Sequence, residues 1–166
     1  MERRIIMKRI DQILSHPVFR EQFALLQEAE KDRIFCRHTM EHFLDVARLM
    51  YIYSLEHHLS ASKELIYATA LMHDIGRLAQ IEMGIPHEQT GAALCDVILP
   101  DCGFSQEETE TIKSAILHHR KAAQDVGNPF YEMLYWADKK SRSCFACDMR
   151  KECNWDKEKM NLEIDD

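Results

Sequence analysis

Histidine and carboxylate side chains recur along this sequence at positions surrounded by apolar residues. The stretch "ATALMHDIGRL", residues 68–78, places His73 and Asp74 next to Leu71 and Ile75. A buried imidazole or carboxylate costs free energy unless a partner satisfies it. A divalent metal ion is one such partner, because imidazole nitrogen and carboxylate oxygen both ligate transition metals. The pair therefore indicates a metal site, provided that other parts of the chain supply further ligands.

Further candidate ligands lie in other segments. His38 and His42 are four residues apart, a spacing that predicts one shared helix face. His119 and Asp138 follow apolar residues by three and four positions, which predicts that both point inward. A lone histidine on an apolar helix face is usually a hydrogen-bonded core residue. Two histidines four residues apart can likewise lie at the contact between two helices without binding a metal. Inward-facing ligands from four or five helices together are what a metal site in a helical bundle requires.

These ligands need helices to position them, and helical spacing of apolar residues occurs along nearly the whole chain. Ser105 with Glu108 has the pattern of a capping box, while Asn128 followed by Pro129 is typical of a helix start. We expect an all-α, single-domain helical bundle of about six to eight helices. The expected helices cover residues 6–14, 15–33, 35–58, 63–80, 87–100, 105–121 and 128–142.

The expected organisation is one compact domain with three parts. Residues 1–35 form N-terminal helices that pack on the core, residues 36–142 form the metal-binding domain, and residues 143–166 form a cysteine-bearing tail. A chain of 166 residues is long enough to bury a core of its own.

Composition excludes several classes of protein. The net charge of −7 argues against nucleic-acid binding, which depends on cationic side chains. No apolar run approaches the roughly 20 residues that span a bilayer, and the basic N-terminus lacks the features of a secretory signal. We therefore expect a cytoplasmic monomer or homodimer without membrane contact, in which the six cysteines are reduced thiols or metal ligands.

Cationic residues follow each candidate ligand segment. Arg77 follows the His-Asp pair, Arg120 and Lys121 follow the two adjacent histidines, and Lys139, Lys140 and Arg142 follow Asp138. This placement favours a phosphorylated substrate, with Arg77 and Lys121 as its phosphate contacts. The alternative is that these cations only complement helix C-termini, where Lys and Arg are common.

A second cluster of possible ligands lies in the tail. Cys144, Cys147 and Cys153 form a C-x2-C-x5-C array, which is typical of part of a structural zinc or iron–sulfur site. Cys36 is the best candidate for a fourth ligand. The alternative is that these thiols are unliganded or redox-active.

The order His42, then His73-Asp74, then Asp138 resembles the HD-domain superfamily of metal-dependent phosphohydrolases. The segments "HFLDVARL", "ALMHDIGR" and "WADKKSR" carry this resemblance, which covers residues 36–142. "HEQTGAAL" and "ILHHR" are similar to additional motifs of members that bind two or more metals. The Gly-Tyr-Pro motif of the cyclic-dinucleotide phosphodiesterases does not follow the histidine pair, so that activity is not expected.

The resemblance implies a ligand set in two groups. The first metal would be held by His42, His73, Asp74 and Asp138, and the second by His87, His118 and His119, with His38 as a further candidate. Asp74 would bridge the two groups, since a carboxylate has two oxygen atoms. His73 and Asp74 would be the catalytic residues, and Fe, Mn, Zn, Co or Ni would suit the mixed nitrogen and oxygen ligands.

The leading functional hypothesis is therefore a metal-dependent phosphohydrolase, which cleaves a phosphoester or phosphoanhydride of a small metabolite or nucleotide with a metal-activated water. One alternative is a non-catalytic module that uses the same ligands for stability or redox sensing. Another is an HD-type di-iron oxygenase, which would consume oxygen instead of hydrolysing a phosphate.

Overall fold

The computed structural model describes residues 6–120 and 127–164, and it confirms the expected all-α fold. No strand occurs in these two ranges. The α-helices are α1 (Lys8–Ser15), α2 (Pro17–Ala29), α3 (Met40–Glu56), α4 (Lys63–Met72), α5 (Arg77–Met83), α6 (His87–Asp101), α7 (Gln106–His118) and α8 (Pro129–Lys140). Two short 3-10 helices, η2 (Cys144–Ala146) and η3 (Lys157–Lys159), follow in the tail.

The helix starts that sequence signals marked are confirmed. Ser105 and Glu108 form a reciprocal capping box at the start of α7. Asn128 accepts a hydrogen bond from the Phe130 N–H at 3.0 Å, and Pro129 is the first residue of α8. These caps satisfy backbone donors that have no partner within the helix.

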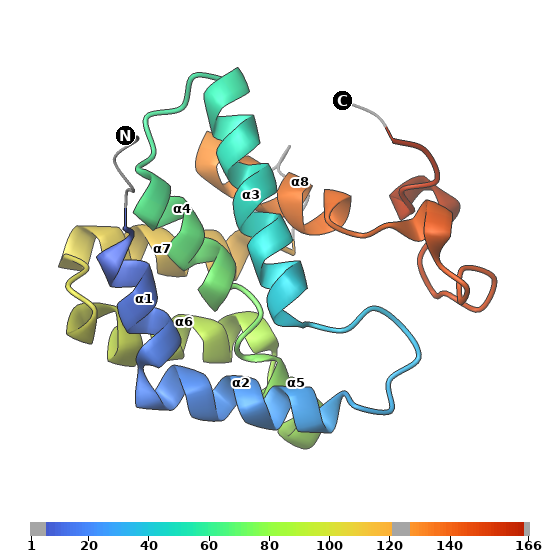
Figure 1. The fold of residues 1–166 in the computed structure, drawn as a ribbon, viewed down its shortest axis with the longest axis horizontal. Helices are drawn as coiled ribbons and strands as arrows, with labels where there is room; N and C mark the ends of the chain where they lie inside the picture. The colour runs from blue at the N-terminus through green and yellow to red at the C-terminus, as the bar shows by residue number, and fades with distance from the viewer. Residues whose placement is uncertain (1–5, 121–126, 165–166) are drawn as a thin grey trace.

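The core consists of two groups of buried apolar side chains on either side of α4. The first joins α2, α3, α4 and α6 through residues such as Phe19, Phe43 and Ile98. The second joins α3, α4 and α8 through residues such as Met50 and Leu134. Figure 1 shows α3 between α4 and α8, with α2 and α6 crossing below. Helix α3 and the end of α4 therefore stand at the centre of the bundle.

The segment before α3 corrects one sequence expectation. Residues 35–39 are not helical, and α3 begins at Met40 because the Thr39 side chain caps it by accepting the His42 N–H at 3.4 Å. The prediction that His38 and His42 share a helix face is wrong, since His38 precedes the helix. Helix α2 likewise ends at Ala29, four residues before the expected end, and the chain then turns into the 30–39 loop.

A second correction concerns residues 63–80, which are not one helix. Helix α4 ends at Met72, residues 73–76 form a turn, and α5 begins at Arg77. The break lets Gly76 lie against the start of α6, where a Cβ atom would stand 2.3 Å from the His87 carbonyl oxygen and 2.5 Å from the Gly91 nitrogen. His73 and Asp74 therefore lie at a helix end, which leaves their side chains free to face several helices.

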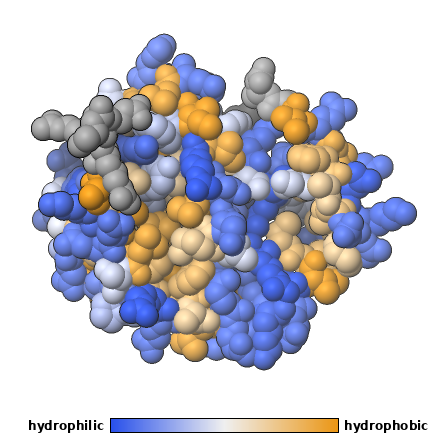
Figure 2. Space-filling view, viewed as in Figure 1, coloured by the Kyte–Doolittle hydropathy of each residue, from blue (hydrophilic) through white to orange (hydrophobic). Residues whose placement is uncertain are grey.

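The C-terminal segment lies apart from the helical bundle. Figure 1 shows it on the side to which the 30–39 loop extends. Hydrophilic side chains border the junction between the bundle and this segment in Figure 2. Within the described ranges, no helix is both long and apolar enough to cross a membrane.

Candidate metal centre

The structure brings the first expected ligand group together from three helical segments. His42 lies in the first turn of α3, His73 and Asp74 lie at the end of α4, and Asp138 lies near the end of α8. One ligand atom from each lies within 4.8 Å of the others, and all four residues are buried. The nearest approach is 3.1 Å, between His73 Nε2 and Asp74 Oδ2.

A second group shares Asp74 with the first. His87 is the first residue of α6 and His119 follows the last residue of α7. Their Nε2 atoms lie 3.1 and 3.8 Å from Asp74 Oδ1. Oδ1 therefore faces the second group, whereas Oδ2 faces the first. This is the arrangement that a carboxylate bridging two metal ions requires.

All five histidines around Asp74 are oriented in the same sense. In each ring Nδ1 contacts an outer oxygen, so that Nε2 points inward. Nδ1 of His73 lies 2.6 Å from the Ala70 carbonyl, and Nδ1 of His119 lies 2.5 Å from the Ile116 carbonyl. A carbonyl oxygen can only accept, so both Nδ1 atoms carry hydrogen, and each ring presents a lone pair at Nε2 when it is neutral.

The same reasoning assigns the ring of His42. Its Nδ1 lies 3.1 Å from Ser141 Oγ, which donates its one hydrogen to the Asp138 carbonyl at 2.7 Å. The hydroxyl must therefore accept from His42 Nδ1–H. His87 Nδ1 similarly faces Gln80 Oε1 at 2.5 Å. Outer partners that fix ring orientation in this way are typical of metal-ligating histidines.

The inward-facing nitrogens converge on one another and on the two carboxylates. Nε2 of His42 and Nε2 of His73 are buried and have no hydrogen-bond partner among the described residues. Nε2 of His87 and Nε2 of His119 lie 3.1 Å apart, with a lone pair on each when both rings are neutral. Converging lone pairs and two buried carboxylates fit a cation at this place.

The pKa values of the clustered histidines also fit a bound cation. Burial lowers the pKa of His42 and of His119 to about 4, so both rings are neutral and able to ligate a metal at physiological pH. Burial would also lower the pKa of His73, but the negative charges of Asp74 and Asp138 outweigh it and raise that pKa to about 10. The carboxylates thus create a strong demand for positive charge at the centre of the cluster.

Glu30 belongs to this site, although sequence reasoning did not identify it. Its Oε1 lies 2.7 Å from His38 Nδ1 and its Oε2 accepts the His38 backbone N–H at 2.8 Å. Burial opposes ionisation of Glu30, but the contacts with His38 outweigh it and hold the pKa of Glu30 below its usual value. Glu30 is 3% exposed and is the one buried glutamate among the described residues. No sequence motif marks it.

Two expected ligands of the second group lie elsewhere. Nε2 of His38 approaches Asp74 Oδ2 at 3.5 Å, so His38 faces the oxygen of the first group. His118 lies in neither group of ligands. Its Nδ1 contacts the Ser114 carbonyl at 2.6 Å and its ring stacks on Tyr131, because the side chains of consecutive residues at the end of α7 point in different directions.

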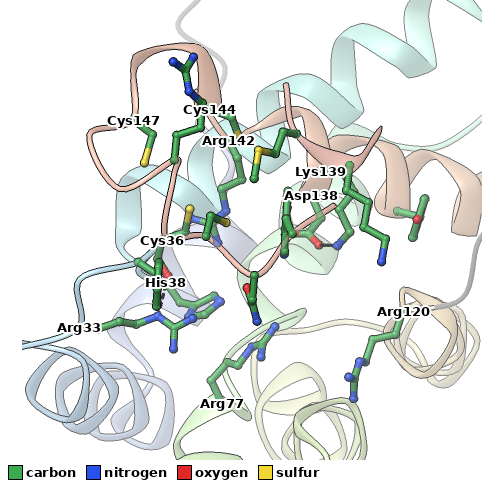
Figure 3. A pocket seen from close by; sticks show the side chains of 18 of the residues that line it. Arg33, Cys36, His38, Arg77, Arg120, Asp138, Lys139, Arg142, Cys144 and Cys147 are labelled. Atoms are coloured by element: carbon green, nitrogen blue, oxygen red, sulfur yellow. Dashed lines mark hydrogen bonds and ion pairs between the residues drawn. The ribbon is translucent and has the colours of Figure 1, made fainter. Parts of the chain in front are cut away.

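A cavity of about 380 Å³ opens on the candidate ligands His38, His119 and Asp138. Of the described residues that line it, Asp138 is the one carboxylate. The lining cations are Arg33, Arg77, Arg120, Lys139, Arg142, Arg150 and Lys159. Figure 3 shows Arg77 and Arg120 facing this space below Asp138 and Lys139. In a protein with a net charge of −7, this concentration of positive charge favours an anionic ligand.

The two expected phosphate contacts have different outcomes. Arg77 lines the cavity and donates from Nε to Asp74 Oδ1 at 3.1 Å, which places its guanidinium beside the ligand cluster. Lys121 lies outside the described residues. Lys139 also lines the cavity, and its Nζ lies 2.5 Å from Asp138 Oδ2.

Comparison with known proteins places this geometry in context. The family model described as HD domain matches residues 39–149. An uncharacterized protein of Clostridium beijerinckii is 45% identical over 135 residues, which cover 81% of this chain and 84% of that protein. The bifunctional uridylyltransferase/uridylyl-removing enzyme of Gluconobacter oxydans is 34% identical over 73 residues, which make up 7% of that enzyme.

A solved structure shares the fold. The crystal structure of a predicted HD superfamily hydrolase from an uncultured Thermotogales bacterium has a TM-score of 0.61 to this chain. The match covers 88% of this chain and 83% of the other, with 23% sequence identity. The helical arrangement is therefore common to both proteins.

Proposed function

The chain belongs to the HD-domain family of metal-dependent hydrolases, and from this premise we propose that it is a phosphohydrolase acting on a small phosphorylated metabolite or nucleotide. The reaction is cleavage of a phosphoester or phosphoanhydride by water. Candidate metal ligands and cationic side chains line one cavity, and this observation carries the proposal.

The size and lining of the cavity support a small substrate. A volume of about 380 Å³ is near the lower end of the range for small-molecule sites. Tyr135 and Trp155 line the cavity together with the cations. An aromatic ring can stack on a nucleobase, so these residues favour a nucleotide over a simple sugar phosphate.

The residues that would hold the metals are those of the two groups around Asp74. His42, His73 and Asp138 would ligate on the Oδ2 side, and His87 and His119 on the Oδ1 side. Metals bound there would lower the pKa of a water molecule and neutralise charge on the phosphate oxygens. The ligands fit Fe, Mn, Zn, Co or Ni, as expected for mixed imidazole and carboxylate donors.

The protein's own side chains have separate roles in this proposal. Asp74 and His73 form the catalytic centre, because Asp74 spans both groups and His73 contacts both carboxylates. Arg77 and Arg120 bind the phosphate from the cavity wall, where a guanidinium can form two parallel hydrogen bonds with its oxygens.

Turnover by the purified protein tests this function. Nucleoside phosphates and matched sugar phosphates are incubated with Mn²⁺, Fe²⁺ or Co²⁺, and released phosphate is measured. We expect hydrolysis that His42→Ala and Asp138→Ala abolish, and a higher KM in Arg120→Gln. Arg48→Gln is the matched control, because Arg48 lies on α3 with its side chain 60% exposed and pairs with Asp45.

Three outcomes would contradict the proposal. No hydrolysis of any phosphate compound with any of these metals excludes a phosphohydrolase. If Asp74→Asn also lowers the melting temperature of such an inactive protein, the metal has a structural role. Oxygen consumption without phosphate release would instead indicate the oxygenase chemistry that the same ligands permit.

A further inference from the structure

Four of the six cysteines converge on the cavity from distant parts of the chain. Cys36 belongs to the 30–39 loop, Cys144 begins η2, and Cys147 and Cys153 follow in the tail. The remaining two, Cys95 and Cys102, are buried in the first apolar group. Figure 3 shows Cys36, Cys144 and Cys147 on one side of the pocket, with Cys36 next to His38.

These four side chains line the same cavity. All four are free thiols in this structure. The fold therefore brings Cys36 near three thiols that lie more than a hundred residues later in the sequence.

The tail has little else to hold it in place. Neither apolar group of the core includes a described residue beyond Ala137, and Phe145, Leu162 and Ile164 are 44%, 40% and 86% exposed. Arg142 donates to the Arg37 carbonyl at 2.8 Å, Asn161 donates to two backbone carbonyls, and Lys139 Nζ lies 5.6 Å from the centre of the Trp155 ring. Ordering one residue costs about 1–2 kcal/mol, so these few hydrogen bonds do not account for an ordered tail. Segments without an apolar core are commonly held by a bound metal or a cross-link.

No three of the four thiols lie close enough together in this structure to ligate one metal ion. Four sulfur atoms around one zinc ion at about 2.3 Å each would stand about 3.8 Å apart. Among the described residues, the groups whose ligand atoms all lie within 4.8 Å of one another are the two around Asp74, and the four thiols do not form another. In a four-iron cluster each cysteine binds a different iron, so the sulfurs stand farther apart than around one ion.

We propose that Cys36, Cys144, Cys147 and Cys153 hold a [4Fe–4S] cluster that fastens the tail to the 30–39 loop. Four thiolates give such a cluster a net negative charge, which Arg33, Arg142 and Arg150 among the cavity-lining residues would offset. The cluster fixes the tail as one wall of the cavity and so sets the positions of Arg150 and Trp155. This site is separate from the His/Asp ligands and goes beyond the proposed hydrolysis.

Iron and acid-labile sulfide report on this cluster independently of activity. The full chain is purified without oxygen, or reconstituted with ferrous iron and sulfide, and its visible absorbance and sulfide content are measured. We expect about four sulfides per chain. Cys147→Ser and Cys153→Ser lose the sulfide, whereas Cys102→Ala, a change to a core cysteine, retains it.

Alkylation of the wild-type protein avoids any folding defect of the variants. Cys36 and Cys147 are exposed in this structure and react with iodoacetamide in the cluster-free protein. Loading the cluster should protect both, as measured by peptide mass spectrometry. Unchanged reactivity after loading overturns the proposal.

Two further results would overturn it. One zinc ion per chain without sulfide excludes the iron–sulfur cluster, and sulfide that persists in Cys147→Ser and Cys153→Ser excludes these ligands. His42→Ala separates this proposal from the hydrolase proposal, since it should abolish phosphate release and retain the sulfide. Failure of either proposal therefore leaves the other testable.

Discussion

His87 Nε2 and His119 Nε2 face each other at 3.1 Å, while Nδ1 of each ring contacts an oxygen on the outer side. Two neutral imidazoles in this arrangement turn lone pairs toward each other beside the Asp74 carboxylate. A cation that accepts both lone pairs removes this repulsion. The pair therefore links metal binding to the stability of the junction between α6 and α7.

Metal removal should lower stability through this pair. Chelator treatment of the metal-loaded protein is expected to lower the melting temperature, since a ligand present at a hundred times its Kd stabilises the folded state by about 2.7 kcal/mol. His119→Ala should shrink this chelator-dependent shift and reduce the bound metal measured by mass spectrometry. His57→Ala, a change to an exposed histidine, should retain the full shift. Equal shifts in all three proteins would contradict a metal at His119.

Glu30→Gln tests whether His38, whose Nε2 lies 3.5 Å from Asp74 Oδ2, is a further metal ligand. The carboxylate accepts from both the backbone and the ring of His38, and loss of its charge should weaken metal binding by about 10- to 100-fold. Metal titration followed by calorimetry measures this change. Glu28→Gln, two residues earlier at the end of α2, is the control, because the Glu28 side chain is 69% exposed. Unchanged affinity in Glu30→Gln would show that His38 does not ligate.

Gly76→Ala tests the turn that presents the His-Asp pair. The added Cβ would meet two backbone atoms of α6 at 2.3 and 2.5 Å, and neither can move without displacing His87. We expect a loss of about 3 kcal/mol or more in the free energy of unfolding, measured by urea denaturation. Gly84→Ala is the control. Gly84 has φ +72° with open space around it, so its cost should be about 1 kcal/mol.

The ion pair between Arg9 and Glu108 should make stability depend on pH. Arg9 Nη1 lies 2.9 and 2.8 Å from the two carboxylate oxygens, and Ser105 N–H donates to Oε2 at 2.9 Å. Burial opposes ionisation of Glu108, but these contacts outweigh it and hold its pKa below the usual 4.5. The folded state therefore favours the ionised carboxylate, and this stabilisation is complete above pH 4.5 and lost as the pH falls through the folded pKa.

Glu108→Gln removes that dependence. The variant should be less stable than the parent above pH 4.5, and the difference should shrink as the pH falls below that value. Thermal melts across this range measure it. Glu107→Gln in the same helical turn is the control and should follow the parent. A constant difference at every pH would exclude a role for ionised Glu108.

The fold class and most ligands could be predicted because they depend on local patterns. Apolar spacing and the caps at Ser105 and Asn128 describe single helices, which form under the control of nearby residues. His42, Asp74 and Asp138 could be recognised because each lies in a short sequence segment that is typical of the family, namely "HFLDVARL", "ALMHDIGR" and "WADKKSR". The two helix boundaries that were wrong depend on distant partners. His38 lies outside α3 where Glu30 contacts it, and α4 ends where Gly76 meets α6.

The sequence by itself determined the residue types that can ligate a metal and the helices that carry most of them. Only the tertiary structure decided which atoms meet. It directed one Asp74 oxygen to each ligand group, turned His118 onto Tyr131, and recruited Glu30. It also brought Cys36 to the same cavity as the tail cysteines. The physical reason is that ring orientation and contacts between distant segments depend on packing among several helices, which no local pattern specifies.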